Sequence, residues 1–203
     1  MKHIIYLSFA FLLICNVYIG LKYYKLRDNS SYIADKYASI SVKEERISQK
    51  LKTYSIYQQT MEGCNIPNVI IGNREKDSLT LFSLSQNTTE NILCFRFKDT
   101  HCDACIQYAM RLLNEVVEKI KGKIVVLSGY TNYTHFAAFA SKQKSKISTY
   151  NIQNIKDWNI DQIEQSYFFI INDGKIHNVF VPLKEDEIYT QNYIDAMIYK
   201  YWE

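Results

Sequence analysis

Two short apolar runs joined by an amphipathic segment constrain the fold of this chain more than any other feature. Residues 91–97, "NILCFRF", and residues 123–129, "KIVVLSG", have the composition of strands buried on both faces, as inside a parallel sheet. From Asp103 onward, apolar residues recur at helical spacing, and lysines followed by Gly122 mark the end of a helix. The recurring residues are Ile106, Ala109, Met110, Leu113, Val116, Val117 and Ile120. The segment therefore predicts a β-α-β unit.

The flanking segments extend this unit on both sides. Residues 68–72 and 79–84 are apolar and enclose a polar stretch, which predicts a β-hairpin. Downstream we expect a helix with Thr134 as its N-cap, a strand, an antiparallel hairpin and a closing amphipathic helix. Their expected bounds are 134–144, 147–152, 166–182 and 185–202. This order predicts an α/β fold, with one mixed central sheet flanked by helices.

The composition gives no basis for several classes of function. A net charge of +3 with no dense block of lysine and arginine gives no reason to expect nucleic-acid binding. The sequence has no G-x-S-x-G motif, no glycine-rich phosphate loop and no paired-carboxylate motif, so the common hydrolases lack their signatures. The chemistry must therefore be sought among the cysteines.

Cys102 and Cys105 form a C-x-x-C motif at a strand-to-helix junction. The strand is expected to end near Phe97, a polar loop "KDTH" follows, and Cys102 begins the helix. The free N–H groups and positive end of the helix dipole would stabilise a thiolate there and lower the pKa of the Cys102 thiol. Cys105 lies within one turn and can close a disulfide. We expect Cys102 to be the attacking thiolate and Cys105 the resolving thiol.

The stretch "CFRFKDTHCDACIQ", its spacing to "YFFIINDGKI", and the closing helix resemble the thioredoxin fold. More narrowly, the combination resembles the membrane-anchored, extracytoplasmic thioredoxin-like oxidoreductases, over roughly Asn65 to Glu203. The resemblance implies a redox-active dithiol that acts on protein disulfides without a cofactor. A second partner, an upstream electron donor, would restore the dithiol.

The sequence departs from this family at two positions. The family carries a cis-proline before the second hairpin, and here that position is Gln165. In the family, the proline shapes binding of the substrate backbone and discourages metal capture. A buried acid often lies six residues before the first cysteine, where this chain has Arg96. Arg96 would either favour the thiolate or pair with Asp99 or another acid at the end of the sheet.

Two neighbours of the dithiol are expected to tune it in opposite directions. The carboxylate of Asp103 opposes a thiolate at Cys102, while His101 and the helix end support it. Since the acid leaves the dithiol less strongly stabilised, we expect a reductant and not an oxidant.

A metal site and a binding module are the alternatives to a redox enzyme. Copper or zinc would need ligands besides Cys102 and Cys105, and no second C-x-x-C or H-x-x-x-H pattern supplies them, so we expect no metal. The residues that could contribute are Cys64, Cys94, His101, His135 and His177. A thioredoxin-like domain that holds a partner without turnover is the third reading, and the missing proline favours it.

The other two cysteines of the globular part are assigned no catalytic role. Cys94 lies in the middle of a strand and is expected to be a buried apolar residue. Cys64 could form a long-range disulfide, pair across a dimer, or be buried.

The N-terminus contains an uncharged apolar run, Ile4–Leu21, flanked by basic residues. At 1.5 Å per residue it nearly crosses a hydrocarbon core of about 30 Å. A cleaved signal peptide would need small residues at a cleavage site, which do not follow the run. Cys15 resembles an acylation site, but Ile14 is bulky and the run continues past it. We expect residues 1–21 to be a transmembrane anchor.

The region between anchor and domain is expected to be a helical stalk over residues 22–62. No glycine or proline interrupts the chain between Gly20 and Gly63. A seven-residue repeat joins Ile33, Ile40, Ile47 and Tyr54, but the companion column is apolar at only two of four places. A coiled coil that pairs two copies and a single amphipathic helix both stay open. The thioredoxin-like domain is expected over 63–203.

The location of the domain depends on two opposing arguments. The more basic flank follows the apolar run, which by the positive-inside rule would keep the domain in the cytoplasm. However, the chain begins like an export signal, and a tethered dithiol domain is most useful where disulfides form. We expect a single-pass protein of the bacterial cytoplasmic membrane with an extracytoplasmic, periplasmic domain.

Overall fold

The chain divides into two compact units, Met1–Lys52 and Thr53–Glu203. The computed structural model describes residues 2–86, 90–120, 123–143, 146–152 and 158–203, and gives only the backbone of residues 2–10, 159 and 160. The second unit includes the last turns of the helix that the sequence assigns to the stalk.

Helix α1 (Lys2–Met61) makes up the described part of the first unit and the beginning of the second. The helix is continuous because residues 2–61 contain no proline and only one glycine, Gly20, so that almost nothing in the sequence interrupts it. The helix ends where Gly63 adopts a φ of +76°, a left-handed conformation that glycine reaches without steric cost.

The transmembrane segment predicted at residues 4–21 is not found in the structure. Where side chains are described, no helix is both long enough and apolar enough to cross a membrane. The described part of the apolar run begins at residue 11, and an 18-residue window starting there already includes Lys22, Lys25 and Arg27. Residues 4–10 of the predicted segment lie outside the described side chains.

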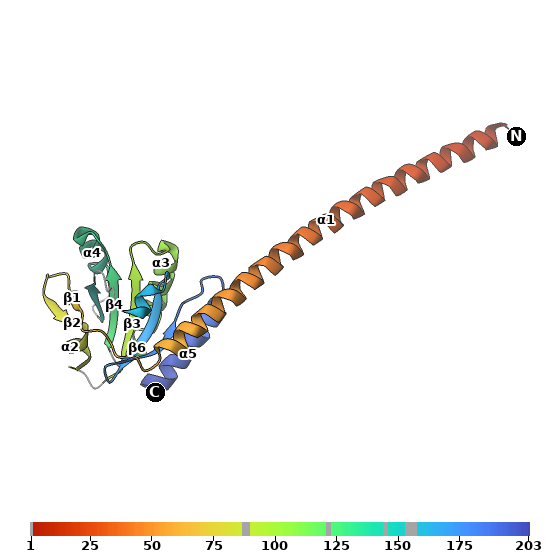
Figure 1. The fold of residues 1–203 in the computed structure, drawn as a ribbon. Helices are drawn as coiled ribbons and strands as arrows, with labels where there is room; N and C mark the ends of the chain where they lie inside the picture. Colours follow the sequence, from red (N-terminus) through yellow and green to blue (C-terminus); the bar gives the residue numbers. More distant parts are fainter. Residues whose placement is uncertain (1, 87–89, 121–122, 144–145, 153–157) are drawn as a thin grey trace. The chain divides into compact units, whose positions relative to one another are not determined.

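The second unit is built on a seven-stranded mixed sheet with the order β2-β1-β5-β4-β3-β6-β7 (Figure 1). Strands β3, β4 and β5 are parallel, while β6 and β7 at one edge and β1 and β2 at the other are antiparallel additions. The strands are β1 (Ile70–Gly72), β2 (Ser78–Thr80), β3 (Ile92–Lys98), β4 (Lys123–Gly129), β5 (Ile147–Asn151), β6 (Tyr167–Asn172) and β7 (Lys175–Phe180). The mixed sheet predicted from the sequence is confirmed.

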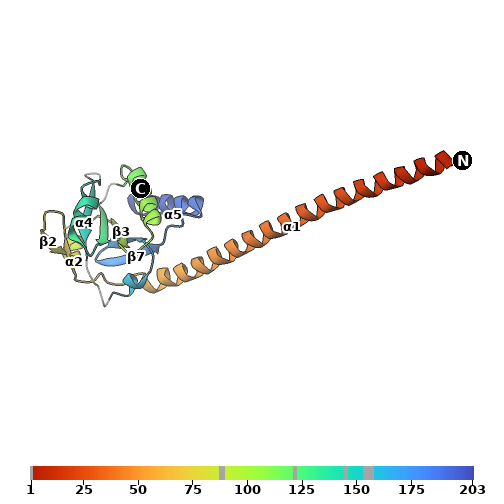
Figure 2. The ribbon, with the colours of Figure 1, turned by 90° about the horizontal axis from the view of Figure 1, so that it is seen from above.

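Helices cover both faces of this sheet. They are α2 (Leu81–Gln86), α3 (Asp103–Val116), α4 (Tyr133–Ala140), the 3-10 helix η1 (Asn159–Gln162) and α5 (Glu187–Trp202). Figure 2 shows α3 and α5 on the same side of the sheet. The predicted α/β fold with helices flanking a mixed sheet therefore holds for the second unit.

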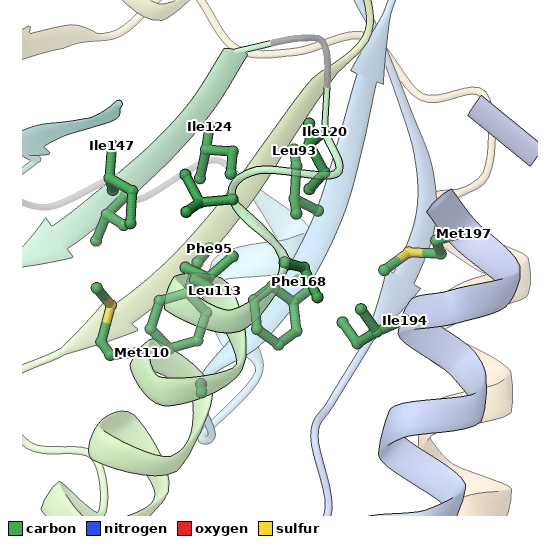
Figure 3. Close-up of a cluster of buried hydrophobic side chains, with 14 of the residues drawn as sticks. Leu93, Phe95, Met110, Leu113, Ile120, Ile124, Ile147, Phe168, Ile194 and Met197 are labelled. Atoms are coloured by element: carbon green, nitrogen blue, oxygen red, sulfur yellow. The ribbon is translucent and has the colours of Figure 1, made fainter. Parts of the chain in front are cut away.

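Alternation along β3 separates two hydrophobic cores. Leu93, Phe95 and Phe97 point to one face, where they pack with α3 and α5 (Figure 3). Cys94 and Arg96 point to the opposite face, so the prediction that Cys94 is buried is confirmed. The core on that face includes Met61, Leu81, Leu84, Trp158 and Ile163, with Tyr54 and Tyr57 packed against it. The end of α1 is thus part of the domain's core.

Two helix boundaries differ from the sequence prediction because side chains cap the backbone. Residues 81–84, expected to belong to a strand over 79–84, lie in α2, since the Thr80 and Ser83 side chains each accept a hydrogen bond from the other's backbone N–H. Asn132, not Thr134, is the N-cap of α4, because its Oδ1 accepts a hydrogen bond from the Thr134 N–H at 2.8 Å.

The end of α3 also comes earlier than predicted. The α-helix stops at Val116, and Lys119 donates its N–H to the Val116 carbonyl in a turn that follows. Gly122, expected just beyond the helix, lies outside the described residues.

Candidate dithiol site

The two cysteines of the C-x-x-C motif lie at the carboxyl end of β3. Cys102 is the N-cap residue of α3, and its carbonyl accepts hydrogen bonds from the N–H groups of Cys105 and Ile106, both at 3.0 Å. Its side chain is exposed, whereas Cys105, inside the first turn, is half-buried. The placement of Cys102 at the start of a helix, as predicted, leaves one thiol open to solvent and the other shielded.

The surroundings shift the pKa values of the two thiols in opposite directions. The Cys105 thiol, followed by the backbone amides of Cys105 and Ala104, lowers the pKa of Cys102. Burial, followed by the neighbouring Cys102, raises the pKa of Cys105 to about 11. Cys102 is therefore the better nucleophile, and Cys105 keeps its proton at neutral pH.

The imidazole of His101 packs back onto the loop. Its Nδ1 accepts a hydrogen bond from the Lys98 N–H at 3.3 Å. Burial, and then the positive charges of Lys98 and Arg96, lower the pKa of His101 to about 4. The ring is consequently neutral at neutral pH and supplies no positive charge to the Cys102 thiolate, contrary to the support expected from it.

Asp103 lies in the first turn of α3. Its Oδ2 accepts a hydrogen bond from Nε2 of Gln107 at 2.7 Å, and both side chains are exposed. The carboxylate next to Cys102 is therefore held by its own helix.

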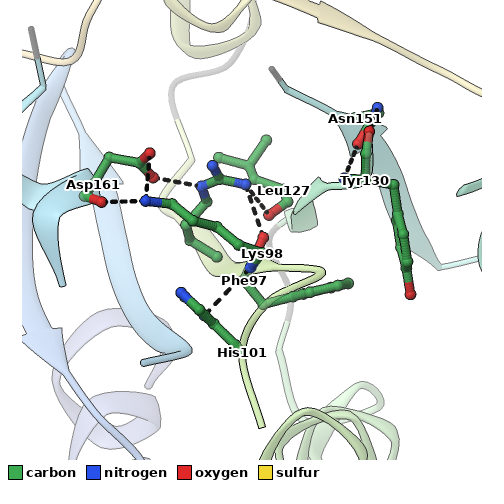
Figure 4. A network of polar contacts seen from close by, with 8 residues as sticks. Phe97, Lys98, His101, Leu127, Tyr130, Asn151 and Asp161 are labelled. Atoms are coloured by element: carbon green, nitrogen blue, oxygen red, sulfur yellow. Dashed lines mark hydrogen bonds and ion pairs between the residues drawn. The ribbon is translucent and has the colours of Figure 1, made fainter. Parts of the chain in front are cut away.

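Arg96 belongs to a buried ionic network and not to the dithiol. Its Nε lies 2.8 Å from Oδ1 of Asp161, and its Nη1 donates to the carbonyls of Phe97 and Leu127. Lys98 Nζ lies 3.0 Å from the other carboxylate oxygen of Asp161, as Figure 4 shows. The sequence left two roles open for Arg96, support of the thiolate or an ion pair with an acid at the end of the sheet. The structure shows the ion pair, and the acid is Asp161.

The acid that pairs with Arg96 is not Asp99. Asp99 instead accepts a hydrogen bond at Oδ2 from the Thr131 N–H at 3.0 Å, which ties the loop before Cys102 to the loop after β4. Because β3 alternates, Arg96 faces the core opposite α3.

Gln165 lies at the same end of the sheet as the dithiol. The register pairs Arg96 of β3 with Tyr167 of β6, which brings the segment before β6 next to the end of β3. The Gln165 side chain is exposed, and its Oε1 accepts a hydrogen bond from the hydroxyl of Tyr54. None of the peptide bonds that the structure describes is cis.

Three charged or polar residues of the site were missed by the sequence analysis. Lys184 and Glu185, in the loop before α5, act electrostatically on the thiols: Lys184 lowers the pKa of both cysteines, and Glu185 raises that of Cys105. Tyr54 was assigned to the stalk. A charge pair just before the closing helix is the only sequence signal that could have pointed to the loop.

The metal-ligand candidates are dispersed. Among the described residues, no group of three histidine, cysteine or acidic side chains is placed to hold a metal ion. His177 Nδ1 lies 2.7 Å from Oε1 of Glu62, and the exposed Cys64 donates its thiol to the Thr60 carbonyl. All five cysteines are free thiols, so Cys64 is neither buried nor in an intramolecular disulfide.

A comparison with protein-family models gives no match, and neither does a comparison with curated protein sequences. Among solved structures, a thioredoxin-like protein from Porphyromonas gingivalis matches with a TM-score of 0.50 and 15% identity, over 66% of this chain and 92% of that protein.

Two further structures match less closely. Reduced Prx3 from Vibrio vulnificus has a TM-score of 0.48 and 15% identity, over 68% of this chain and 97% of its own. BsSco, a member of the Sco family of cytochrome c oxidase assembly proteins, has a TM-score of 0.45 and 16% identity, over 66% of this chain and 94% of its own. The second unit has the thioredoxin-like fold, which confirms the fold that the sequence resemblance implied.

Proposed function

We propose that the domain is a thiol–disulfide oxidoreductase that reduces protein disulfides with Cys102 and Cys105. The observation that carries the proposal is the asymmetry of the two thiols: Cys102 is exposed with a lowered pKa, and Cys105 is half-buried with a pKa of about 11. A reactive first thiolate and a shielded second thiol are the two components that disulfide exchange requires.

The exchange takes place in two steps. The Cys102 thiolate attacks one sulfur of the substrate disulfide, so that a mixed disulfide forms and the other substrate sulfur leaves and takes a proton from water. Cys105 then loses its proton to water and attacks the Cys102 sulfur. The mixed disulfide breaks, the Cys102–Cys105 disulfide forms, and the second substrate thiol is released. The substrate gains two electrons, which a dithiol donor must return to the domain.

The surroundings of the dithiol support the reducing direction. A strong oxidant needs a reduced form whose thiolate is strongly stabilised. Here His101 is neutral, Arg96 is paired with Asp161, and the carboxylate of Asp103 is next to Cys102. Few positive charges therefore favour the reduced state, and the reduction potential should lie nearer to about −270 mV than to about −120 mV.

A redox titration of the full chain tests this function. The protein is equilibrated across a glutathione and dithiothreitol series, and the free Cys102 and Cys105 thiols are counted by alkylation and mass spectrometry. A single two-electron transition is expected. Cys102→Ser should abolish disulfide reduction, and Cys105→Ser should accumulate the mixed disulfide. If the two thiols stay unpaired at every potential, the proposal is wrong.

Attachment to a membrane is a separate part of the proposal and rests on the sequence. The apolar run 4–21 supports a single-pass anchor in the bacterial cytoplasmic membrane. The more basic flank that follows the run favours a cytoplasmic domain, and the proposed location outside the cytoplasm rests instead on the dithiol, which is most useful where disulfides form. Pairing of two copies through residues 22–62 rests on the seven-residue repeat alone. Fractionation of cells expressing the full chain, with and without residues 2–21, tests the anchor: the truncated chain should leave the membrane fraction.

A further inference from the structure

Tyr54 connects helix α1 to the rim of the dithiol site. Its ring packs against the hydrophobic core on the face opposite α3, next to Tyr57 and near Met61. Its hydroxyl donates a hydrogen bond to Oε1 of Gln165, a residue 111 positions later in the chain. The core thus fixes the tyrosine, and the tyrosine fixes an otherwise exposed glutamine side chain.

The hydroxyl of Tyr54 is close enough to the dithiol for the two to interact electrostatically. The pKa of Tyr54 is raised to about 12, first by burial, while the hydrogen bond with Gln165 lowers it; the negative charge of Glu185, and that of Cys105 when this thiol is ionised, raise it further. The hydroxyl is therefore a permanent hydrogen-bond donor at any pH at which the thiols exchange. Gln165 itself precedes β6, at the edge where β3 ends and the C-x-x-C motif begins.

The hydrogen bond also determines how Gln165 can be used. Because Oε1 accepts the tyrosine proton, the orientation of the carboxamide is set, and its amino group is directed away from Tyr54. An amino group with two N–H donors is suited to the carbonyl oxygens of an extended peptide. Without Tyr54, an exposed glutamine would have to give up its rotamer freedom at the moment of binding.

We propose that Tyr54 is a positioning residue of the dithiol site, which holds the carboxamide of Gln165 so that it binds the backbone of the substrate polypeptide joined to Cys102. This inference rests on the proposed function and deepens it. What it adds is the role of Tyr54, which makes the end of α1 part of the proposed site.

The test compares two disulfides that differ in their polypeptide. The substrates are a disulfide-linked peptide and 2-hydroxyethyl disulfide, which has no backbone amide. Tyr54→Phe in the full chain keeps the ring and removes only the hydroxyl. We expect KM for the peptide to rise about three- to tenfold, as for the loss of one hydrogen bond, with kcat unchanged. Reduction of 2-hydroxyethyl disulfide should be unaffected.

Two further variants separate positioning from a general structural effect. Gln165→Ala, at an exposed side chain, should give the same KM increase, and the double variant should be no worse than either single one. Tyr57→Phe, a change of the same kind on the same helix, should leave both substrates unaffected.

The outcomes distinguish failure of the inference about Tyr54 from failure of the proposed function. If the wild-type chain reduces neither disulfide, the proposed function fails, and the inference fails with it. If the wild type reduces both but Tyr54→Phe keeps its peptide KM, the inference alone is wrong. Equal losses on both substrates, or additive losses in the double variant, would also overturn it.

Discussion

The guanidinium of Arg96 and the carboxylate of Asp161 form an ion pair of 2.8 Å in which both side chains are buried. Arg96 is 1% exposed and Asp161 is 8% exposed, so neither charge is compensated by bulk water. Each is compensated by the other, by Lys98 and by backbone carbonyls. A pair of this kind contributes little net stability, but loss of one member leaves a buried charge unpaired.

We therefore predict that Asp161→Asn lowers the free energy of unfolding by about 3 kcal/mol, measured by urea denaturation. The matched control is Glu187→Gln, which breaks the exposed pair of Glu187 with Arg111, at 3.3 Å, and should cost less than about 1 kcal/mol. An Asp161→Asn variant as stable as this control would contradict the account of the network.

Gly129 is predicted to tolerate no side chain because of the same arginine. A Cβ atom built there would lie 2.9 Å from Nη1 of Arg96 and 3.2 Å from Nη2. The guanidinium cannot swing away, since its hydrogen bonds to Asp161, Phe97 and Leu127 hold it.

Gly129→Ala should therefore lower the free energy of unfolding by about 1–3 kcal/mol, the usual range for overpacking. In Gly72→Ala the nearest atom would be the Asp77 carbonyl oxygen at 3.9 Å, an ordinary contact, so this strand glycine is the control. Thermal unfolding of both variants checks the difference, and equal melting temperatures would show that the Arg96 side chain moves aside to make room.

The origin of this network explains what could and could not be predicted from the sequence. Periodicity predicted most of the strands and helices because each element reflects its own burial pattern, and the strand–loop–helix order placed Cys102 correctly. Arg96 and Asp161 are 65 positions apart, and nothing local marks the acid. Pairing at that separation is determined by the packing of the sheet, which only the three-dimensional structure supplies.

The contact of Tyr54 could not be predicted from the sequence either, because its partner is also distant in the chain. A seven-residue repeat places it in a stalk helix, and that repeat records only neighbours on the helix itself. Its partner, Gln165, is 111 positions away. The prediction of the α4 N-cap was wrong for a local reason. Asn132 and Thr134 are both good N-cap residues, and the backbone geometry decided between them.

His101 is predicted to make the domain less stable in mild acid. Its pKa is about 4 in the folded state and near 6.5 when unfolded, so between these values the unfolded chain binds the additional proton. The contribution of His101 to stability is complete above pH 6.5 and is lost as the pH falls towards 4. Because the ring is half-exposed, we expect a loss of about 1 kcal/mol, well below the full shift.

The comparison of wild type with His101→Gln isolates this effect from the titration of carboxylates. The stability of both is measured in urea at pH 7 and at pH 4.5. The difference between the two proteins should shrink at the lower pH by about 1 kcal/mol, because glutamine does not titrate. If the stability difference between wild type and His101→Gln is the same at both pH values, the imidazole of His101 has the same pKa in the folded and the unfolded chain.

The two thiols of the site are predicted to react at different rates with iodoacetamide. At pH 8 Cys105, with a pKa of about 11, is about 0.1% ionised, while the lowered pKa of Cys102 makes its thiolate more abundant. Peptide mapping of the reduced chain should show Cys102 modified at least about tenfold faster than Cys105. The buried Cys94 should be modified only after denaturation. Equal rates at Cys102 and Cys105 would remove the asymmetry on which the proposed function depends.

Lys184 is predicted to account for part of the Cys102 reactivity. Its ammonium group lowers the pKa of Cys102 from the loop before α5, and both side chains are exposed, so the interaction passes through solvent and is screened by salt. Lys184→Gln should slow alkylation of Cys102 at pH 7 by about twofold in low salt, with little difference from wild type at 1 M salt. Lys200→Gln, an exposed lysine near the end of α5, changes the net charge by the same amount and should leave the rate unaffected. If both variants slow the reaction equally, the effect belongs to net charge and not to the position of Lys184.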